Sequence, residues 1–161
     1  MIPKQQKFAP LKILDIKEKK KIEKELQERF GIEKIRGFLL MKGQERIFLF
    51  SGNMHPREIK TLEDGVIIER VGTYFGKIQN NEVRLSIEGT IALKDQIKKN
   101  IFILTETQAE DWLKGRDLDI ATGERGFMIM KHGEDFLGCG KASEKKIGNF
   151  IPKSRRLKER N

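Results

Sequence analysis

The sequence predicts an α+β fold with small, barrel-like sheets. Short apolar runs recur along the chain and are separated by Gly, Asn and Asp turn signals, which indicates many short strands. Helix signals are confined to a few segments. The chain has 161 residues, of which 37% are hydrophobic, and this suits one medium domain or two small domains packed together.

We expect the first helix at about residues 15–30. Ile22, Leu26 and Phe30 recur at intervals of four and share one face, and Gly31 is placed to end the helix. Lysines and glutamates are mixed over the other faces, which is typical of a solvated surface helix. An RNA-binding role for these lysines is therefore the weaker interpretation.

A strand-rich stretch follows this helix. Its apolar runs are short, and turn residues separate them. Strands are predicted at 38–41, 46–50, 66–71 and 83–87, with glycines bracketing 73–75, a short helix at 56–60 and turns at 42–45, 63–65 and 80–81.

Charge and periodicity change at residues 94–100, which predicts a junction between domains at 1–94 and 95–161. Beyond it, Thr105 and Gln108 have the spacing of a capping box, so a helix is expected over 106–114 with Trp112 on its inner face. The remaining predictions are a short buried strand at 101–104, strands at 127–130 and 136–142, and a turn at 133–135.

The positive charge is concentrated at the C-terminal end. The whole chain carries a formal net charge of +9, and residues 141–161 hold eight basic but only two acidic side chains. Such a segment repels itself unless an anion neutralises it, and nucleic-acid phosphate is the commonest such partner. The alternative is a solvated, frayed tail.

Apolar residues within this basic segment argue against a free tail. Ile147, Phe150, Ile151 and Leu157 are spaced among the cations as anchors that would hold the segment on the domain. Lys153, Arg155 and Arg156 would then contact phosphates, whereas Asn149 would either contact a base edge or cap a turn. Phe150 would stack on an unpaired base or, more often for a single Phe, pack in the core.

Sequence motifs for catalysis and metal binding are missing. Cys139 is the single cysteine and has no neighbouring base, and His55 and His132 lie far apart, so neither a zinc site nor a nucleophile is expected. The segment 137–141 lacks the spacing of a phosphate loop, and no dinucleotide fingerprint occurs. We therefore expect no cofactor and no enzymatic activity.

The same composition predicts a cytoplasmic protein. No apolar run approaches the length of a membrane span, and the first residues do not resemble a secretory signal. A single cysteine also fits a reducing compartment. We expect no membrane partner.

Residues 100–157 resemble a PUA-type RNA-binding domain. The similarity lies in the segments 109–118, 126–130 and 136–142 and in the tail 149–157, and it is greatest to the PUA-like C-terminal module of RsmF-type Sun-family rRNA cytosine methyltransferases. The N-terminal part, through about Leu93, is similar to the α/β pre-PUA domain of small archaeal RNA-binding proteins.

The resemblance implies a C-terminal β pseudo-barrel that binds structured rRNA or tRNA. Those methyltransferases also carry a cofactor-binding domain and paired catalytic cysteines, which this sequence lacks, so the chain resembles their detached RNA-recognition half. The RNA-binding residues that follow from the resemblance and the charge pattern are Lys114, Gly115, Arg116, Gly138, Gly140, Lys141, Lys145, Lys146, Asn149, Lys153, Arg155 and Arg156. For Arg116, pairing with Asp117 or another acid is the alternative.

Three functions remain open. The favoured hypothesis is a non-catalytic RNA-binding protein of ribosome or rRNA maturation or tRNA modification, with an RNA methyltransferase or a ribosome-assembly factor as a further partner. The second is an adaptor that tethers a separate RNA-modifying enzyme through protein contacts. The third is a small enzyme of unrecognised type, which would require a deep pocket with converging titratable groups.

Overall fold

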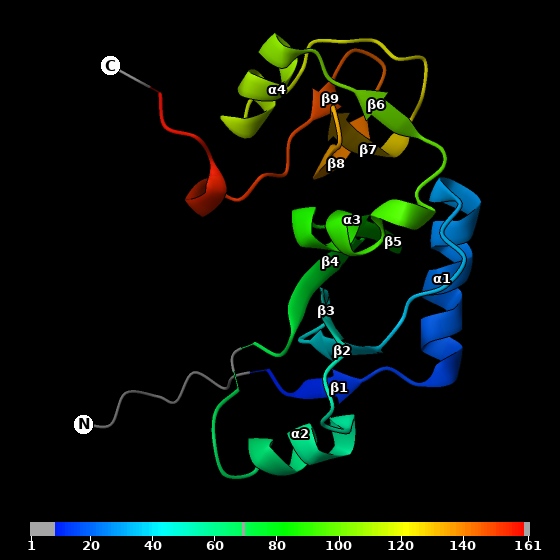
Figure 1. Cartoon of the computed structure of the whole chain (residues 1–161), viewed down its shortest axis with the longest axis vertical. Helices are drawn as coiled ribbons and strands as arrows, with labels where there is room; N and C mark the ends of the chain where they lie inside the picture. The colour runs from blue at the N-terminus through cyan, green and yellow to red at the C-terminus, as the bar shows by residue number, and fades with distance from the viewer. Residues whose placement is uncertain (1–8, 69, 160–161) are drawn as a thin grey trace.

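The computed structural model describes residues 9–68 and 70–159 and has the predicted α+β architecture, with two sheets that meet at a short central helix (Figure 1). The first sheet has five antiparallel strands in chain order. They are β1 (Leu11–Ile13), β2 (Phe38–Lys42), β3 (Arg46–Phe50), β4 (Thr73–Gln79) and β5 (Glu82–Leu85), accompanied by helices α1 (Ile16–Phe30) and α2 (Pro56–Glu63).

The second sheet has four strands in the order β6-β7-β8-β9, of which β6 runs parallel to β7 and the other pairs are antiparallel. This is the small β unit that the PUA resemblance predicts. Its elements are β6 (Ile101–Ile103), α4 (Glu106–Leu113), β7 (Gly126–His132), β8 (Asp135–Ala142) and β9 (Ile147–Gly148), followed by the 3-10 turn η2 (Lys153–Arg155). Helix α3 (Ile87–Ala92) and the 3-10 turn η1 (Lys94–Gln96) connect the two sheets.

Helices α1 and α4 lie where the sequence predicts them, and local capping signals explain their ends. At α1, Asp15 accepts a hydrogen bond from Glu18 N at 2.8 Å while Glu18 accepts one from Asp15 N, and Gly31 ends the helix with a φ of 81°. At α4, Thr105 and Gln108 form the predicted capping box. Helix α2 is also confirmed and extends to Glu63.

The predicted strand at 66–71 is wrong. The open edge of β3 is taken by β4, with Leu49 paired to Thr73, so residues 66–68, 70 and 71 lie outside the sheet, and residue 69 is outside the described residues. Val66 and Ile67 are consequently 57% and 65% exposed. An apolar run predicts a strand only where a sheet edge is available for it.

The predicted strand at 83–87 ends two residues early. Ser86 accepts a hydrogen bond from Gly89 N at 2.9 Å and so caps α3, which begins at Ile87. The turn at Asn80 and Asn81 is confirmed, with φ values of 52° and 61° that suit a tight hairpin. Strand β6 is only partly buried, since Ile103 is 62% exposed.

Helix α3 packs between the two sheets. A Cβ added to Gly89 would lie 2.1 Å from the carbonyl oxygen of Phe75 in β4, and one added to Gly138 in β8 would lie 3.3 Å from Ile87. Gly138 N also donates to Thr90 Oγ1 at 3.2 Å. These approaches bring β4 and β8, which are distant in sequence, to opposite sides of one helix.

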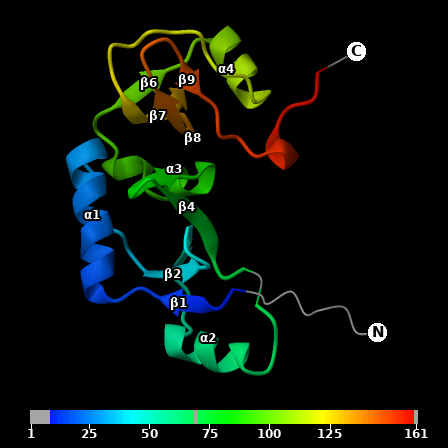
Figure 2. The ribbon, with the colours of Figure 1, turned by 180° about the vertical axis from the view of Figure 1, so that it is seen from behind.

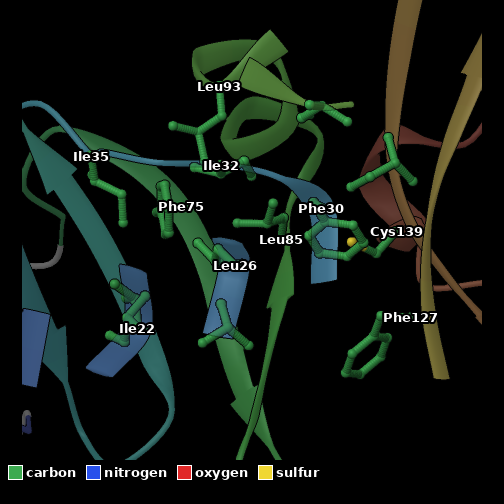
Figure 3. Close-up of a cluster of buried hydrophobic side chains, with 14 of the residues drawn as sticks. Ile22, Leu26, Phe30, Ile32, Ile35, Phe75, Leu85, Leu93, Phe127 and Cys139 are labelled. Atoms are coloured by element: carbon green, nitrogen blue, oxygen red, sulfur yellow. The ribbon is translucent and has the colours of Figure 1, made fainter. Parts of the chain in front are cut away.

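One hydrophobic cluster extends across both sheets (Figure 3). Phe30 of α1 and Leu85 of β5 lie in it together with Phe127 of β7 and Cys139 of β8. Helix α1 lies along one side of the molecule in both views (Figures 1 and 2), and its C-terminal end is bound to the connection between the sheets by Lys98 N, which donates to Phe30 O at 2.8 Å. No helix within the described part of the chain is long and apolar enough to cross a membrane.

Candidate nucleic-acid interface

The C-terminal segment 147–157 is attached to the β unit by side chains buried beneath it. Ile147 and Ile151 are 0% and 4% exposed and pack with Trp112, as the anchor interpretation predicts. Phe150 is partly buried against the shared core, and its ring centroid lies 6.1 Å from that of Phe127. Leu157 differs from the prediction, because its side chain is 51% exposed.

Asn149 is the main polar attachment of this segment. Its Nδ2 donates to the carbonyl oxygens of Trp112 at 2.8 Å and Arg116 at 3.0 Å, and its Oδ1 accepts from Ile151 N at 2.8 Å. Its backbone N–H donates to Asp117 Oδ1 at 2.8 Å. Of the two roles that the sequence allowed, the structure shows turn capping, and it ties the segment to the end of α4.

The end of α4 forms a loop in which Gly115 has a φ of 86°, a conformation that favours glycine. The guanidinium of Arg156 lies against this glycine: an added Cβ would be 2.2 Å from Arg156 Nε. Arg156 Nε in turn donates to Ile151 O at 3.0 Å. Arg156 therefore covers Gly115, and a ligand reaches that backbone only when Arg156 moves.

The cations around this loop are paired with carboxylates. Arg116 Nη1 lies 2.7 Å from Asp111 Oδ1, and its Nη2 contacts Glu159. Arg116 therefore pairs with acids, as the alternative interpretation allowed, but with these two and not with Asp117. Lys146 pairs instead with Asp117 at 2.9 Å, and Lys114 pairs with Glu110 at 3.1 Å.

These pairs shift the ionisation of their members. The hydrogen bonds that Arg116 donates to Asp111 and Glu159 raise the pKa of Arg116. The hydrogen bond that Lys146 donates to Asp117 raises the pKa of Lys146 and lowers the pKa of Asp117. Exposed ion pairs contribute little to stability. A phosphate can therefore replace the carboxylates at modest cost.

The two glycines of β8 are packing positions. A Cβ on Gly140 would lie 2.6 Å from Ile147 Cγ2 and 2.8 Å from Trp112 Cη2, and Gly138 packs on α3. Gly138 and Gly140, which the sequence analysis assigned to RNA binding, therefore lie against neighbours within the chain.

The predicted cations do not all face one way. Lys141 Nζ lies 5.5 Å from the ring centroid of Phe127, and Lys145 and Lys153 are exposed without an ion pair among the described residues. Arg155 contacts Glu88 of α3, away from Arg116. The structure thus brings together Lys114, Arg116, Lys146 and Arg156 at the end of α4 and separates Arg155 from them.

Arg155 lines a cleft of about 510 Å³ between the first sheet, α3 and the C-terminal segment. Arginines from other parts of the chain line it as well: Arg46, Arg70 and Arg84. Sequence reasoning missed these three residues. The one available signal was the alternation of β5, where Val83 and Leu85 are buried and Arg84 lies on the opposite face.

Comparison with known proteins agrees with this architecture. The family profile described as the methyltransferase RsmF PUA domain matches residues 99–157. These residues are thus similar to the PUA domain of RsmF-type methyltransferases. The matched segment contains both the loop at the end of α4 and the anchored C-terminal segment.

Full-length relatives extend the similarity beyond the PUA domain. The chain is 29% identical over 153 residues to the ribosomal RNA small subunit methyltransferase F of Shewanella oneidensis, covering 94% of this chain and 31% of that protein. Over 128 residues it is 29% identical to the protein of the same name from Enterobacter sp. strain 638, covering 78% of this chain and 25% of the relative. The chain therefore spans about a third or less of the length of the curated relatives it matches.

Proposed function

We propose that this chain binds structured RNA without catalysing a reaction itself, and that it acts in rRNA maturation or tRNA modification in the cytoplasm. The observation that carries the proposal is the match of residues 99–157 to the RsmF PUA domain profile, together with the basic C-terminal segment that Asn149 anchors in place. A fixed array of cations binds a polyanion with less loss of conformational freedom than a mobile tail does.

We place the principal RNA contact at the loop that ends α4, where Arg116, Lys146 and Arg156 gather. Lys141, Lys145 and Lys153 would add longer-range attraction. The relatives are rRNA methyltransferases, so an RNA methyltransferase or an assembly factor is the proposed protein partner. We further propose that residues 1–94 form a pre-PUA-like domain that supports the RNA-binding domain of residues 95–161.

Filter binding with a structured rRNA fragment tests this function. Affinity should fall with salt, with about 0.7–0.9 added to the log–log slope for each phosphate neutralised. The double variant Arg116→Ala/Lys146→Ala should bind more weakly and show a smaller slope. Lys17→Ala/Lys20→Ala removes the same charge from the exposed face of α1 and should leave binding close to that of the wild type. Salt-independent binding, or equal losses in both variants, contradicts the assignment.

An adaptor function is the second candidate, and exposed apolar residues favour it. Leu62, Val66 and Ile67 are 49%, 57% and 65% exposed near the end of α2. Grouped exposed apolar side chains of this kind are typical of protein contacts. Recovery of one stoichiometric RNA-modifying enzyme after nuclease treatment, without RNA enrichment in untreated samples, would support the adaptor over direct RNA binding.

A further inference from the structure

The cleft lined by Arg46, Arg70, Arg84 and Arg155, here called the arginine cleft, lies outside the loop at the end of α4. Its walls come from β3, β4, β5, α3 and β8 and from the C-terminal segment, which returns toward α3 and β4 in both views (Figures 1 and 2). Its volume of about 510 Å³ is in the range of small-ligand sites.

The charge of the arginine cleft is one-sided. Among the described residues that line it, the four arginines face a single acid, Glu88, and that acid contacts Arg155. Arg46 and Arg84 have no ion pair with any carboxylate in the described part of the chain. Guanidinium groups gathered around a concave surface without counter-charges attract an anion.

Aromatic rings hold two of these guanidinium groups in place. Arg84 Cζ lies 4.2 Å from the ring centroid of Phe150, and Arg46 Cζ lies 5.4 Å and 5.6 Å from the centroids of Phe48 and Tyr74. Stacking uses the face of a guanidinium and leaves its N–H edge available for hydrogen bonds. The arginines are thus positioned, and their donors remain available to a ligand.

The same surfaces match the two halves of a nucleotide. Guanidinium edges bind phosphate oxygens in pairs, whereas Tyr74, Phe150 and the arginine planes offer flat surfaces on which an unpaired base stacks. A base in a duplex is already stacked and paired, so it would not enter this cleft. The combination favours single-stranded over double-stranded RNA.

We propose that the arginine cleft takes one unpaired nucleotide of the RNA that the PUA domain binds, with its phosphate on Arg46, Arg84 and Arg155 and its base against Tyr74 or Phe150. This inference rests on the proposed RNA-binding function. Glu88 occupies Arg155 in the unbound state, and the incoming phosphate replaces that carboxylate.

The test uses the full chain and fluorescence anisotropy with a labelled single-stranded RNA, an RNA duplex with an unpaired 3′ extension, and the same duplex with blunt ends. Arg46→Met and Arg84→Met keep an unbranched apolar side chain at each position and remove the guanidinium groups that lie over the rings. Together they should weaken binding to the two RNAs with unpaired nucleotides tenfold or more and leave binding to the blunt duplex within about twofold. Glu88→Gln should tighten binding to the same two RNAs, because Arg155 loses its competing carboxylate.

Arg57→Met is the matched control, since Arg57 is an exposed arginine of α2 away from the cleft, and circular dichroism checks that each variant is folded. If the Arg46/Arg84 variant binds all three RNAs as the wild type does, the cleft assignment is overturned while RNA binding stands. If the wild type binds none of them, the proposed function itself fails. Equal affinity for free AMP and for the single-stranded RNA, measured by calorimetry, would also overturn the inference and make the ligand a free nucleotide.

Discussion

Replacing Asn149 with alanine tests whether the C-terminal segment is anchored as described. The substitution removes three side-chain hydrogen bonds, to Trp112 O, Arg116 O and Ile151 N, at 2.8, 3.0 and 2.8 Å. Each such bond contributes a net of about 1 kcal/mol, so the free energy of unfolding should fall by about 3 kcal/mol. The loss includes the cost of leaving the amide of the buried Ile151 unpaired.

Urea unfolding measures this loss. With an m value of about 2 kcal/mol per M, a loss of that size moves the midpoint down by about 1.5 M. Lys145→Ala is the matched control, because Lys145 is exposed two residues before this segment and has no ion pair among the described residues. Its midpoint should stay close to that of the wild type.

Amide hydrogen exchange separates local from global loosening. If only the segment detaches, protection should fall at Ile151 and at Leu157, whose N–H donates to Leu113 O at 2.9 Å, while the amides of β7 and β8 keep theirs. An Asn149→Ala protein with the wild-type midpoint and wild-type exchange at Ile151 would refute the anchoring argument.

Three further outcomes follow from the packing and electrostatics. Gly140→Ala places a Cβ within 2.8 Å of Trp112 and within 2.6 Å of Ile147, so it should destabilise the fold by about 1–3 kcal/mol in a thermal melt. Burial raises the pKa of the Cys139 thiol to about 12, so at pH 8 Ellman's reagent should label it only after denaturant is added, and rapid labelling of the folded protein would contradict its burial. The hydrogen bond from Lys146 lowers the pKa of Asp117 below the ordinary aspartate value of 3.8. The ionised Asp117 therefore stabilises the fold at neutral pH, and this stabilisation is lost as the pH falls below 3.8. Asp117→Asn should flatten that part of the acid-unfolding profile.

Elements defined by local chemistry were predictable from the sequence. The capping boxes at Asp15 and Thr105, the αL glycine at position 31 and the turn at Asn80 each satisfy backbone groups within a few residues. Elements that depend on partners distant in the sequence could not be predicted in this way. The short strands β1 and β9 exist because β2 and β8 offer edges to them, and residues 66–68, 70 and 71 remain outside the sheet because β4 occupies the edge of β3.

The same distinction applies to the candidate site. Apolar residues among the cations predicted that the C-terminal segment is held on the domain, and Ile147 and Ile151 confirm it. The arginine cleft was not predictable, because Arg46, Arg84 and Arg155 come together only through the packing of β3 and β5 against the returning segment. Periodicity reports which face of a strand a residue occupies and does not report which distant segment that face meets.

The C-terminal segment connects the two candidate RNA contacts through adjacent residues. Arg155 contacts Glu88 on α3 and lines the arginine cleft, whereas Arg156 covers Gly115 at the end of α4. Both depend on the same short turn η2 and on the attachment at Asn149 upstream of it. We expect that a nucleotide that draws Arg155 from Glu88 also shifts the turn that holds Arg156 over Gly115. Occupation of one contact should thus change the affinity of the other, and Asn149→Ala, which removes the attachment that both contacts share, should weaken both.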